Sequence, residues 1–143
     1  MYISLLPCED IGMLLLMILF YFVAGICGSS GLLGPKGSIS SPNYPNGYGL
    51  NEYCRWAISV ANHKKASVQI KNLKTDKTFD SLEISDGANG RLIASLSGLL
   101  PKPITYTSAS NKLDLKFISD GKSVGAVEGF EANYLASSTL IVS

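Results

Sequence analysis

The sequence lacks a charge excess of either sign. Its 143 residues carry 12 Lys and Arg against 11 Asp and Glu, a formal net charge of +1. This balance predicts no nucleic-acid partner and gives no electrostatic reason to expect an anionic membrane surface as partner. The sequence also has only one histidine, His63, and no G-x-S-x-G motif. A Ser-His-Asp hydrolase is therefore not expected, and we interpret His63 as a solvated turn residue.

Long apolar runs are absent after residue 26, but one occurs before it. Residues 11–26 are almost wholly apolar and carry no charge. The run is shorter than the roughly 20 residues of a membrane-spanning helix, so it fits a secretory signal peptide better. We predict a signal peptide over residues 1–25, with Val23 and Gly25 at the small-residue positions before the cleavage point. The preceding residues lack Lys and Arg and include Glu9 and Asp10, which is atypical. A retained membrane anchor and a buried helix are the alternatives.

Cysteine is scarce, and the sequon Asn-x-Ser/Thr is absent. The three cysteines are Cys8, Cys27 and Cys54. If the signal peptide is removed, Cys8 goes with it and two cysteines remain in an oxidising compartment. The simplest inference is a Cys27–Cys54 disulfide, which contributes about 3–4 kcal/mol by loop-closure entropy. One histidine and two paired cysteines leave too few ligands for a zinc site. The expected location is secreted, without membrane attachment after cleavage.

A helical period is also missing after residue 27, where the pattern alternates every second residue. Apolar residues alternate with polar ones in the segments CRWAISV, SVQIKNL, SLEISDG, KLDLKFIS and GFEANYL. Such alternation predicts strands with one buried face, and the Gly-, Asn- and Asp-rich segments between them predict turns. Trp56 falls on a buried face and is expected in the core. The sequence therefore predicts an all-β antiparallel sandwich over residues 26–135, with a frayed tail over 136–143.

These segments, taken together and in order, resemble the CUB domain family. The resemblance rests on a first cysteine before a Gly-rich stretch, then GSISSPNYPNGY, NEYCRWAI, FDSLEISDG, SASNKLDLKFISD and GFEANY. It implies a jelly-roll-like sandwich of two antiparallel sheets and a non-enzymatic module that binds proteins or glycans. Cys27 and Cys54 match the first disulfide of the family. The second cysteine pair is absent, because its positions are occupied by Lys77 and Ser97.

The resemblance also implies a calcium site at one end of the sandwich. Tyr48, Asp80 and Asp120 match its tyrosine and its two aspartates, whereas Asn72 occupies the position of its glutamate, eight residues before Asp80. Calcium affinity rises with the number of carboxylates, so we expect weak binding at most, with Asp76 as an alternative carboxylate in the same loop. The competing interpretation is that Asp80 and Asp120 only make hydrogen bonds within turns.

We therefore predict a secreted recognition module that binds an extracellular protein or glycan through loops bearing Tyr48, Asp80 and Asp120. Two alternatives remain: a recruitment module from a modular extracellular protease, and a surface protein tethered by an uncleaved anchor. The basic residues of 63–65 and 71–77 are interpreted as a solubilising surface.

Overall fold

The computed structural model describes residues 27–122 and 126–137. The predicted signal peptide, its cleavage point and Cys8 lie outside the described residues. Within the described residues, no helix has the length and apolar character needed to cross a membrane. The described chain consists of strands and loops, which confirms the predicted all-β class.

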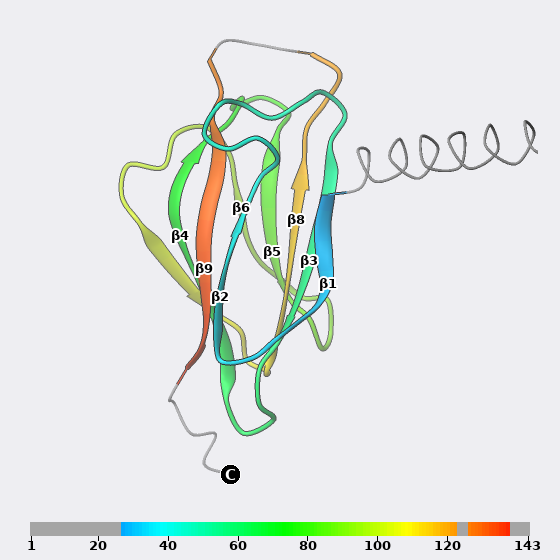
Figure 1. Cartoon of the computed structure of the whole chain (residues 1–143), viewed down its shortest axis with the longest axis vertical. Helices are drawn as coiled ribbons and strands as arrows, with labels where there is room; N and C mark the ends of the chain where they lie inside the picture. Colours follow the sequence, from blue (N-terminus) through cyan, green and yellow to red (C-terminus); the bar gives the residue numbers. More distant parts are fainter. Residues whose placement is uncertain (1–26, 123–125, 138–143) are drawn as a thin grey trace, which may run out of the picture.

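In the described part of the chain, nine strands form two sheets packed face to face (Figure 1). One sheet has five strands in the order β1-β3-β8-β5-β6, and the other has four in the order β2-β9-β4-β7. The strands are β1 (Cys27–Leu33), β2 (Lys36–Ser40), β3 (Tyr53–Ser59), β4 (Lys65–Lys74), β5 (Ser81–Asp86), β6 (Leu92–Leu96), β7 (Ile104–Thr107), β8 (Lys112–Ile118) and β9 (Gly129–Ser137). The predicted sandwich of two sheets is thus confirmed.

The core lies between the sheets and follows from the two-residue period of the sequence. In β3, Trp56 and Ile58 are buried, while the residues beside them are more exposed. Trp56 contacts Phe130 edge-to-face at 5.3 Å between ring centroids, and Phe117 lies 5.6 Å from Phe130. Since these rings come from both sheets, they hold the sheets together through burial and through favourable ring geometry.

Strand β1 is the element that the apolar pattern did not predict. Its sequence, CGSSGLL, is Gly- and Ser-rich, yet it pairs with β3 along its length. This pairing is parallel, whereas the other strand pairs in both sheets are antiparallel. The antiparallel sandwich thus includes one parallel pair at this edge. Backbone pairing to β3 and the disulfide at Cys27 determine this strand, rather than side-chain alternation.

The loops fall into two groups at the two ends of the sandwich. The loops that follow β2, β4, β6 and β8 meet at the end drawn at the top of Figure 1, which we call the loop end. At the opposite end, β9 continues through Ala136 and Ser137, two residues into the predicted tail. Residues 138–143 lie outside the described residues.

Candidate functional site

The loop end gathers polar side chains from three loops that are distant in sequence. Tyr48 comes from the loop after β2, Asp80 lies just before β5, and Asp120 follows β8. The loops are joined through their backbones, because the Asn51 amide donates to the Asp120 carbonyl at 2.8 Å. The structure thus brings together Tyr48, Asp80 and Asp120, as the sequence predicted.

Tyr48 is the centre of this group. Its ring packs edge-to-face on the buried Phe117, with 4.8 Å between centroids. Its hydroxyl donates a hydrogen bond to Asp80 Oδ2 and accepts one from the Asp76 backbone amide at 3.1 Å. Burial, followed by the hydrogen bond to Asp80, raises the pKa of Tyr48 well above its usual range. The hydroxyl therefore keeps its proton at neutral pH and orients the Asp80 carboxylate by donation.

Asp80 is held on both of its oxygens. Only 3% of the residue is exposed, and Oδ1 accepts the Asp120 backbone amide at 2.9 Å. Asp120 uses its own Oδ1 to accept the Lys122 backbone amide at 3.0 Å, which closes a tight turn after β8. These hydrogen bonds are the turn interactions that the competing interpretation expects, so by themselves they do not indicate a metal.

Asn72 is not part of this group. It lies on β4 next to the buried Leu73, so strand alternation places it on the outer face of the sheet. Its amide donates to Glu131 Oε2 of β9 at 3.4 Å, on an exposed surface. The residue eight positions before Asp80 therefore lies in strand β4 and not at the loop end.

Asp76 lies where the sequence-based mapping placed Asn72. Only 7% of Asp76 is exposed, and its Oδ1 accepts the Thr78 backbone amide at 2.8 Å. Its other oxygen, Oδ2, is buried and has no hydrogen-bond partner among the described residues. An unpaired carboxylate oxygen is costly to bury, which makes this atom the clearest indication that the site accepts a cation.

The group borders a small cleft of about 20 Å³, large enough for one ion or one water. We call it the acidic cleft. Its lining residues are Tyr48, Gly49, Leu50, Asp76, Asp80, Ser119, Lys122 and Val127. Carboxylate, hydroxyl and carbonyl oxygens are the ligands that calcium prefers, so this donor set fits that ion.

The carboxylate oxygens of Asp76, Asp80 and Asp120 do not converge on a single position. Among the described residues, the group of three whose candidate ligand atoms all lie within 4.8 Å of one another is Cys27, Glu52 and Cys54. Two members of that group are joined as a disulfide and have no thiolate to offer a metal. For a cation in the acidic cleft, the Asp120 carboxylate would have to rotate away from the Lys122 amide.

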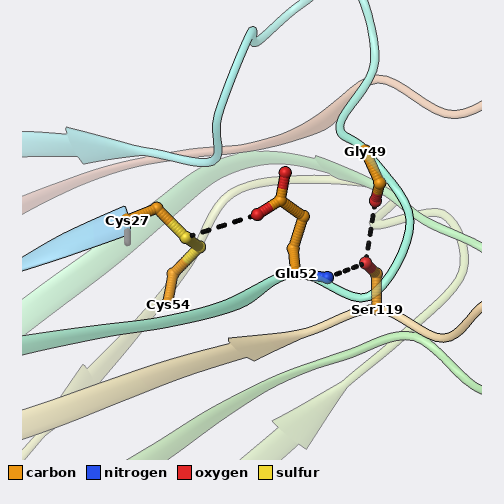
Figure 2. Close-up of a disulfide and its surroundings, with 5 residues drawn as sticks. All are labelled: Cys27, Gly49, Glu52, Cys54 and Ser119. Atoms are coloured by element: carbon orange, nitrogen blue, oxygen red, sulfur yellow. Dashed lines mark hydrogen bonds between the residues drawn. A yellow bond between two sulfur atoms is a disulfide. The ribbon is translucent and has the colours of Figure 1, made fainter. Parts of the chain in front are cut away.

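The predicted disulfide lies beside Glu52, close to Gly49 and Ser119 of the loop end (Figure 2). Cys27 and Cys54 are bonded, with their Cα atoms 4.6 Å apart. Oε2 of Glu52 lies 3.7 Å from Cys27 Sγ; because a disulfide sulfur carries no proton, this is a contact and not a hydrogen bond. The Glu52 amide donates to Ser119 Oγ at 2.9 Å, and that hydroxyl donates to the Gly49 carbonyl at 2.8 Å. The disulfide is therefore connected through Glu52 to the loops that form the cleft.

The missing second cysteine pair is replaced by hydrogen bonds between the same loops. Ser97 Oγ donates to the Lys77 carbonyl at 3.5 Å, a long contact. Two shorter bonds follow: the Thr75 amide donates to the Gly98 carbonyl, and the Gly98 amide donates to Thr75 Oγ1, both at 2.9 Å. The loops after β4 and β6 thus remain together without a covalent link.

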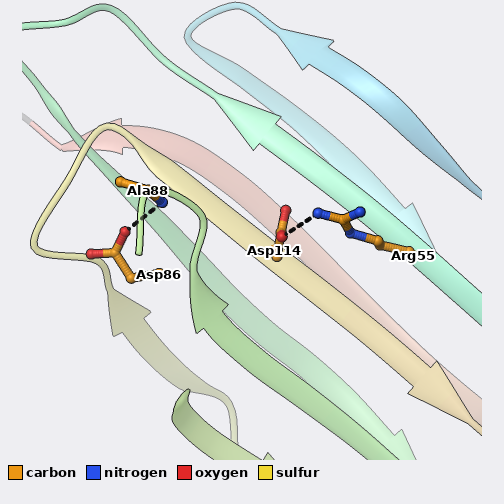
Figure 3. A network of polar contacts seen from close by, with 4 residues as sticks. All are labelled: Arg55, Asp86, Ala88 and Asp114. Atoms are coloured by element: carbon orange, nitrogen blue, oxygen red, sulfur yellow. Dashed lines mark hydrogen bonds and ion pairs between the residues drawn. The ribbon is translucent and has the colours of Figure 1, made fainter. Parts of the chain in front are cut away.

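Two further polar groups have structural roles (Figure 3). Burial alone would raise the pKa of Asp86, but hydrogen bonds from Ser110, Ala88 and Ser108 outweigh it and lower that pKa. On the outer face of the five-stranded sheet, Arg55 and Asp114 form an ion pair at 2.6 Å. The hydrogen bond to Asp114 raises the pKa of Arg55. Asp86 and the Arg55–Asp114 pair thus interact with other groups of the fold, and we assign them structural roles.

The remaining sequence candidates lie away from the acidic cleft. His63 is exposed in the turn between β3 and β4, at the end opposite the loop end. Two lysines of the predicted basic surface are paired: Lys71 with Glu131 at 3.5 Å and Lys74 with Glu128 at 3.1 Å. This pairing agrees with the interpretation of a solubilising surface.

Comparison with known proteins places the chain in a family. The model of the CUB domain matches residues 27–134. Human membrane frizzled-related protein is 40% identical over 109 residues, covering 73% of this chain and 17% of that protein. Bone morphogenetic protein 1 of Xenopus laevis is 33% identical over 115 residues, covering 76% of this chain and 16% of that protein. This chain therefore corresponds to less than a fifth of the length of either relative.

A similar solved structure is the crystal structure of the MASP-1 CUB2 domain bound to Ca²⁺. It aligns with a TM-score of 0.61 and 24% identity, covering 76% of this chain and all of that one. A likeness at this identity supports the fold alone. The ordered motifs, the two-sheet sandwich, the disulfide and the family match agree, and this chain belongs to the CUB domain family.

Proposed function

We propose that this chain is an extracellular, non-enzymatic recognition module that binds a protein partner at the loop end, assisted by calcium in the acidic cleft. The observation that carries this proposal is the buried, unpaired Oδ2 of Asp76 beside Asp80. In this assignment Asp76, rather than Asn72, supplies the additional carboxylate. Tyr48, Asp80 and Asp120 complete the set that the sequence predicted.

The residues of the cleft have separate tasks in this proposal. Asp76 and Asp80 are oriented from the loops around them, Asp76 by the Thr78 amide and Asp80 by Tyr48. Asp120, which is half-buried, would join the set by rotation of its side chain. A bound calcium ion would supply positive charge that holds these acidic groups together. Tyr48 lines the cleft in a fixed orientation, because its ring is packed on Phe117.

The partner chemistry follows from the charge of the cleft. A cluster of carboxylates favours a basic side chain, Lys or Arg, presented by the partner. A neutral glycan would lack this electrostatic attraction, which favours a protein partner over a glycan. The relatives are much longer than the matched region, which agrees with a module that recruits a binding partner to a larger protein. The second candidate function is therefore a recruitment module of a larger modular protein, such as an extracellular protease. Removal of residues 1–25 and an autonomous domain over 26–135 belong to the same proposal.

Thermal unfolding of the mature chain with millimolar calcium, and then with excess chelator, tests the calcium site. We expect calcium to raise the unfolding midpoint, because a ligand that binds only the folded state stabilises it. Asp76→Asn should abolish most of this rise. It should leave the metal-free midpoint unchanged or higher, since the Thr78 hydrogen bond is kept and a buried charge is removed.

Asn72→Ala is the matched control, because it removes the residue that spacing alone assigned to the site. We expect it to show the same calcium-induced rise as the wild-type chain. A wild-type midpoint that does not respond to calcium would exclude the calcium site. A rise that persists in Asp76→Asn but disappears in Asn72→Ala would return the ligand role to Asn72.

A further inference from the structure

One basic side chain belongs to the acidic cleft itself. Lys122 is exposed and lines the cleft together with Asp76 and Asp80. Among the described residues that line the cleft, it is the only Lys or Arg. Its backbone amide donates to Asp120 Oδ1 at 3.0 Å, so the turn after β8 fixes where this side chain begins. The lysine therefore lines the cleft with the carboxylates of Asp76 and Asp80, and a third carboxylate, Asp120, accepts its backbone amide.

Lys122 has no ion-pair partner within the described part of the chain. Among the described residues, the ion pairs are Arg55–Asp114, Lys71–Glu131 and Lys74–Glu128, and none includes Lys122. Its ammonium group stands on a flexible stem of four carbons, which lets it sample positions over the cleft. Among the described residues, Asp76 of the same cleft has a buried carboxylate oxygen, Oδ2, without a hydrogen-bond partner.

We propose that Lys122 is the internal counter-cation of the acidic cleft and competes there with calcium and with the basic side chain of a partner. This inference rests on the proposed calcium-assisted function. Without a metal, the Lys122 ammonium offsets the repulsion between the carboxylates of Asp76, Asp80 and Asp120. When calcium binds, that ammonium must leave the cleft and remains as a nearby like charge, which lowers calcium affinity.

Competition of this kind predicts two effects of opposite sign from one substitution. Lys122→Met keeps most of the length of the stem but removes the charge. The metal-free variant should be less stable than the wild-type chain, since the carboxylates lose their internal cation. Its calcium affinity should rise about three- to tenfold, because a like charge near the ion is removed. If Lys122 had a merely structural role, the substitution would lower both the metal-free stability and the calcium affinity.

The experiment is calorimetric titration of the metal-free, mature chain with calcium, together with thermal unfolding in chelator. Lys122→Arg should behave like the wild-type chain, because the charge is retained. Lys112→Met is the matched control: this exposed lysine lies at the other end of β8 and outside the lining of the cleft. We expect it to leave calcium affinity unchanged. The gain in Lys122→Met should shrink as ionic strength rises.

The outcomes separate this inference from the proposed function. Equal calcium affinity in the wild-type chain and Lys122→Met would overturn the competition and leave the calcium site intact. Binding by Lys122→Met alone would support both, with Lys122 excluding calcium from the wild-type cleft. An absence of binding in both chains would overturn both proposals.

Discussion

Two buried aspartates, Asp86 and Asp76, lie at opposite ends of the sandwich and differ in how their carboxylates are hydrogen-bonded. Asp86 Oδ1 accepts the Ala88 amide at 2.8 Å and the Ser110 hydroxyl at 2.6 Å, within a network that also includes Ser108. Asp76 has a comparable turn bond to Thr78 but leaves Oδ2 buried without a partner. Hydrogen bonds within the fold stabilise the Asp86 carboxylate. The free Oδ2 of Asp76 is the atom to which we assign the proposed cation.

The lowered pKa of Asp86 makes a prediction about acid stability. Hydrogen bonds favour the charged carboxylate in the folded state, so the unfolded chain binds more protons at acidic pH. The stabilising contribution of Asp86 is fully present above its unfolded pKa, near 4, and is lost as pH falls through the lower folded value. Asp86→Asn should therefore reduce the slope of unfolding free energy against pH in the acid range.

Chemical denaturation between about pH 3 and 7 measures that slope. The Asn oxygen can still accept the Ala88 amide, so the variant should remain folded at neutral pH. An identical pH slope in the wild-type chain and Asp86→Asn would contradict the assigned role of the Asp86 charge.

Residue types could be predicted at the loop end, but the carboxylate set could not be assigned completely. Tyr48, Asp80 and Asp120 follow strands whose ends are evident from the sequence, and the structure brings them together. The spacing of eight residues before Asp80 assigns Asn72 to the glutamate position of the calcium site. This assignment assumes that the loop before Asp80 has a constant length. The chain leaves β4 only after Lys74, so Asn72 is still in the strand and Asp76 is the first acidic residue of the loop. Only the position of the strand end decides between them.

At the scale of elements, β1 shows how backbone contact can replace side-chain pattern. Gly28 has a φ of 98°, and a Cβ at this residue would lie 2.0 Å from the Arg55 carbonyl oxygen. The strand approaches β3 so closely that only glycine fits at this position. The composition that made this segment resemble a loop is thus what permits its parallel pairing.

Two glycine substitutions in β1 separate close contact from backbone strain. Gly31 has a φ of 73°, but an added Cβ would meet nothing within 4 Å. Gly31→Ala should therefore lower the unfolding free energy by about 1 kcal/mol, from strain alone. Gly28→Ala should lower it by roughly 1–3 kcal/mol more, because β1 must also move away from β3.

Urea denaturation of both variants, with the disulfide intact, measures this difference. If the two substitutions destabilise the chain equally, the close approach of β1 to β3 does not contribute to stability.

For the whole molecule, one disulfide and the hydrogen bonds between the loops after β4 and β6 hold the loop end of the sandwich together. The Cys27–Cys54 disulfide fixes the edge strand near the loop end. At the same end, hydrogen bonds between Thr75 and Gly98 hold the loops after β4 and β6 together. Lys77 and Ser97 are close enough for a contact between Ser97 Oγ and the Lys77 carbonyl.

Replacing both residues should restore the cysteine pair that the family resemblance implies. The double variant Lys77→Cys/Ser97→Cys would close a loop of about 21 residues and should raise the unfolding free energy by about 2–3 kcal/mol. The unfolding midpoint should rise by at least about 5 °C and return to the wild-type value after selective reduction of the new bond. The single cysteine variants are the controls. Two free thiols in the double variant under oxidising conditions would show that the positions do not face each other.

The sequence by itself determined the all-β class, the alternating core, the Cys27–Cys54 pair and the presence of Tyr48 and Asp80 at the loop end. These features depend on local order: alternation places side chains on one face, and turn residues separate the strands. The tertiary structure alone decided the parallel strand β1, the placement of Asp76 instead of Asn72, and the presence of Lys122 beside the carboxylates. Each of these depends on backbone approach and loop length between distant segments, which residue spacing along one chain does not encode.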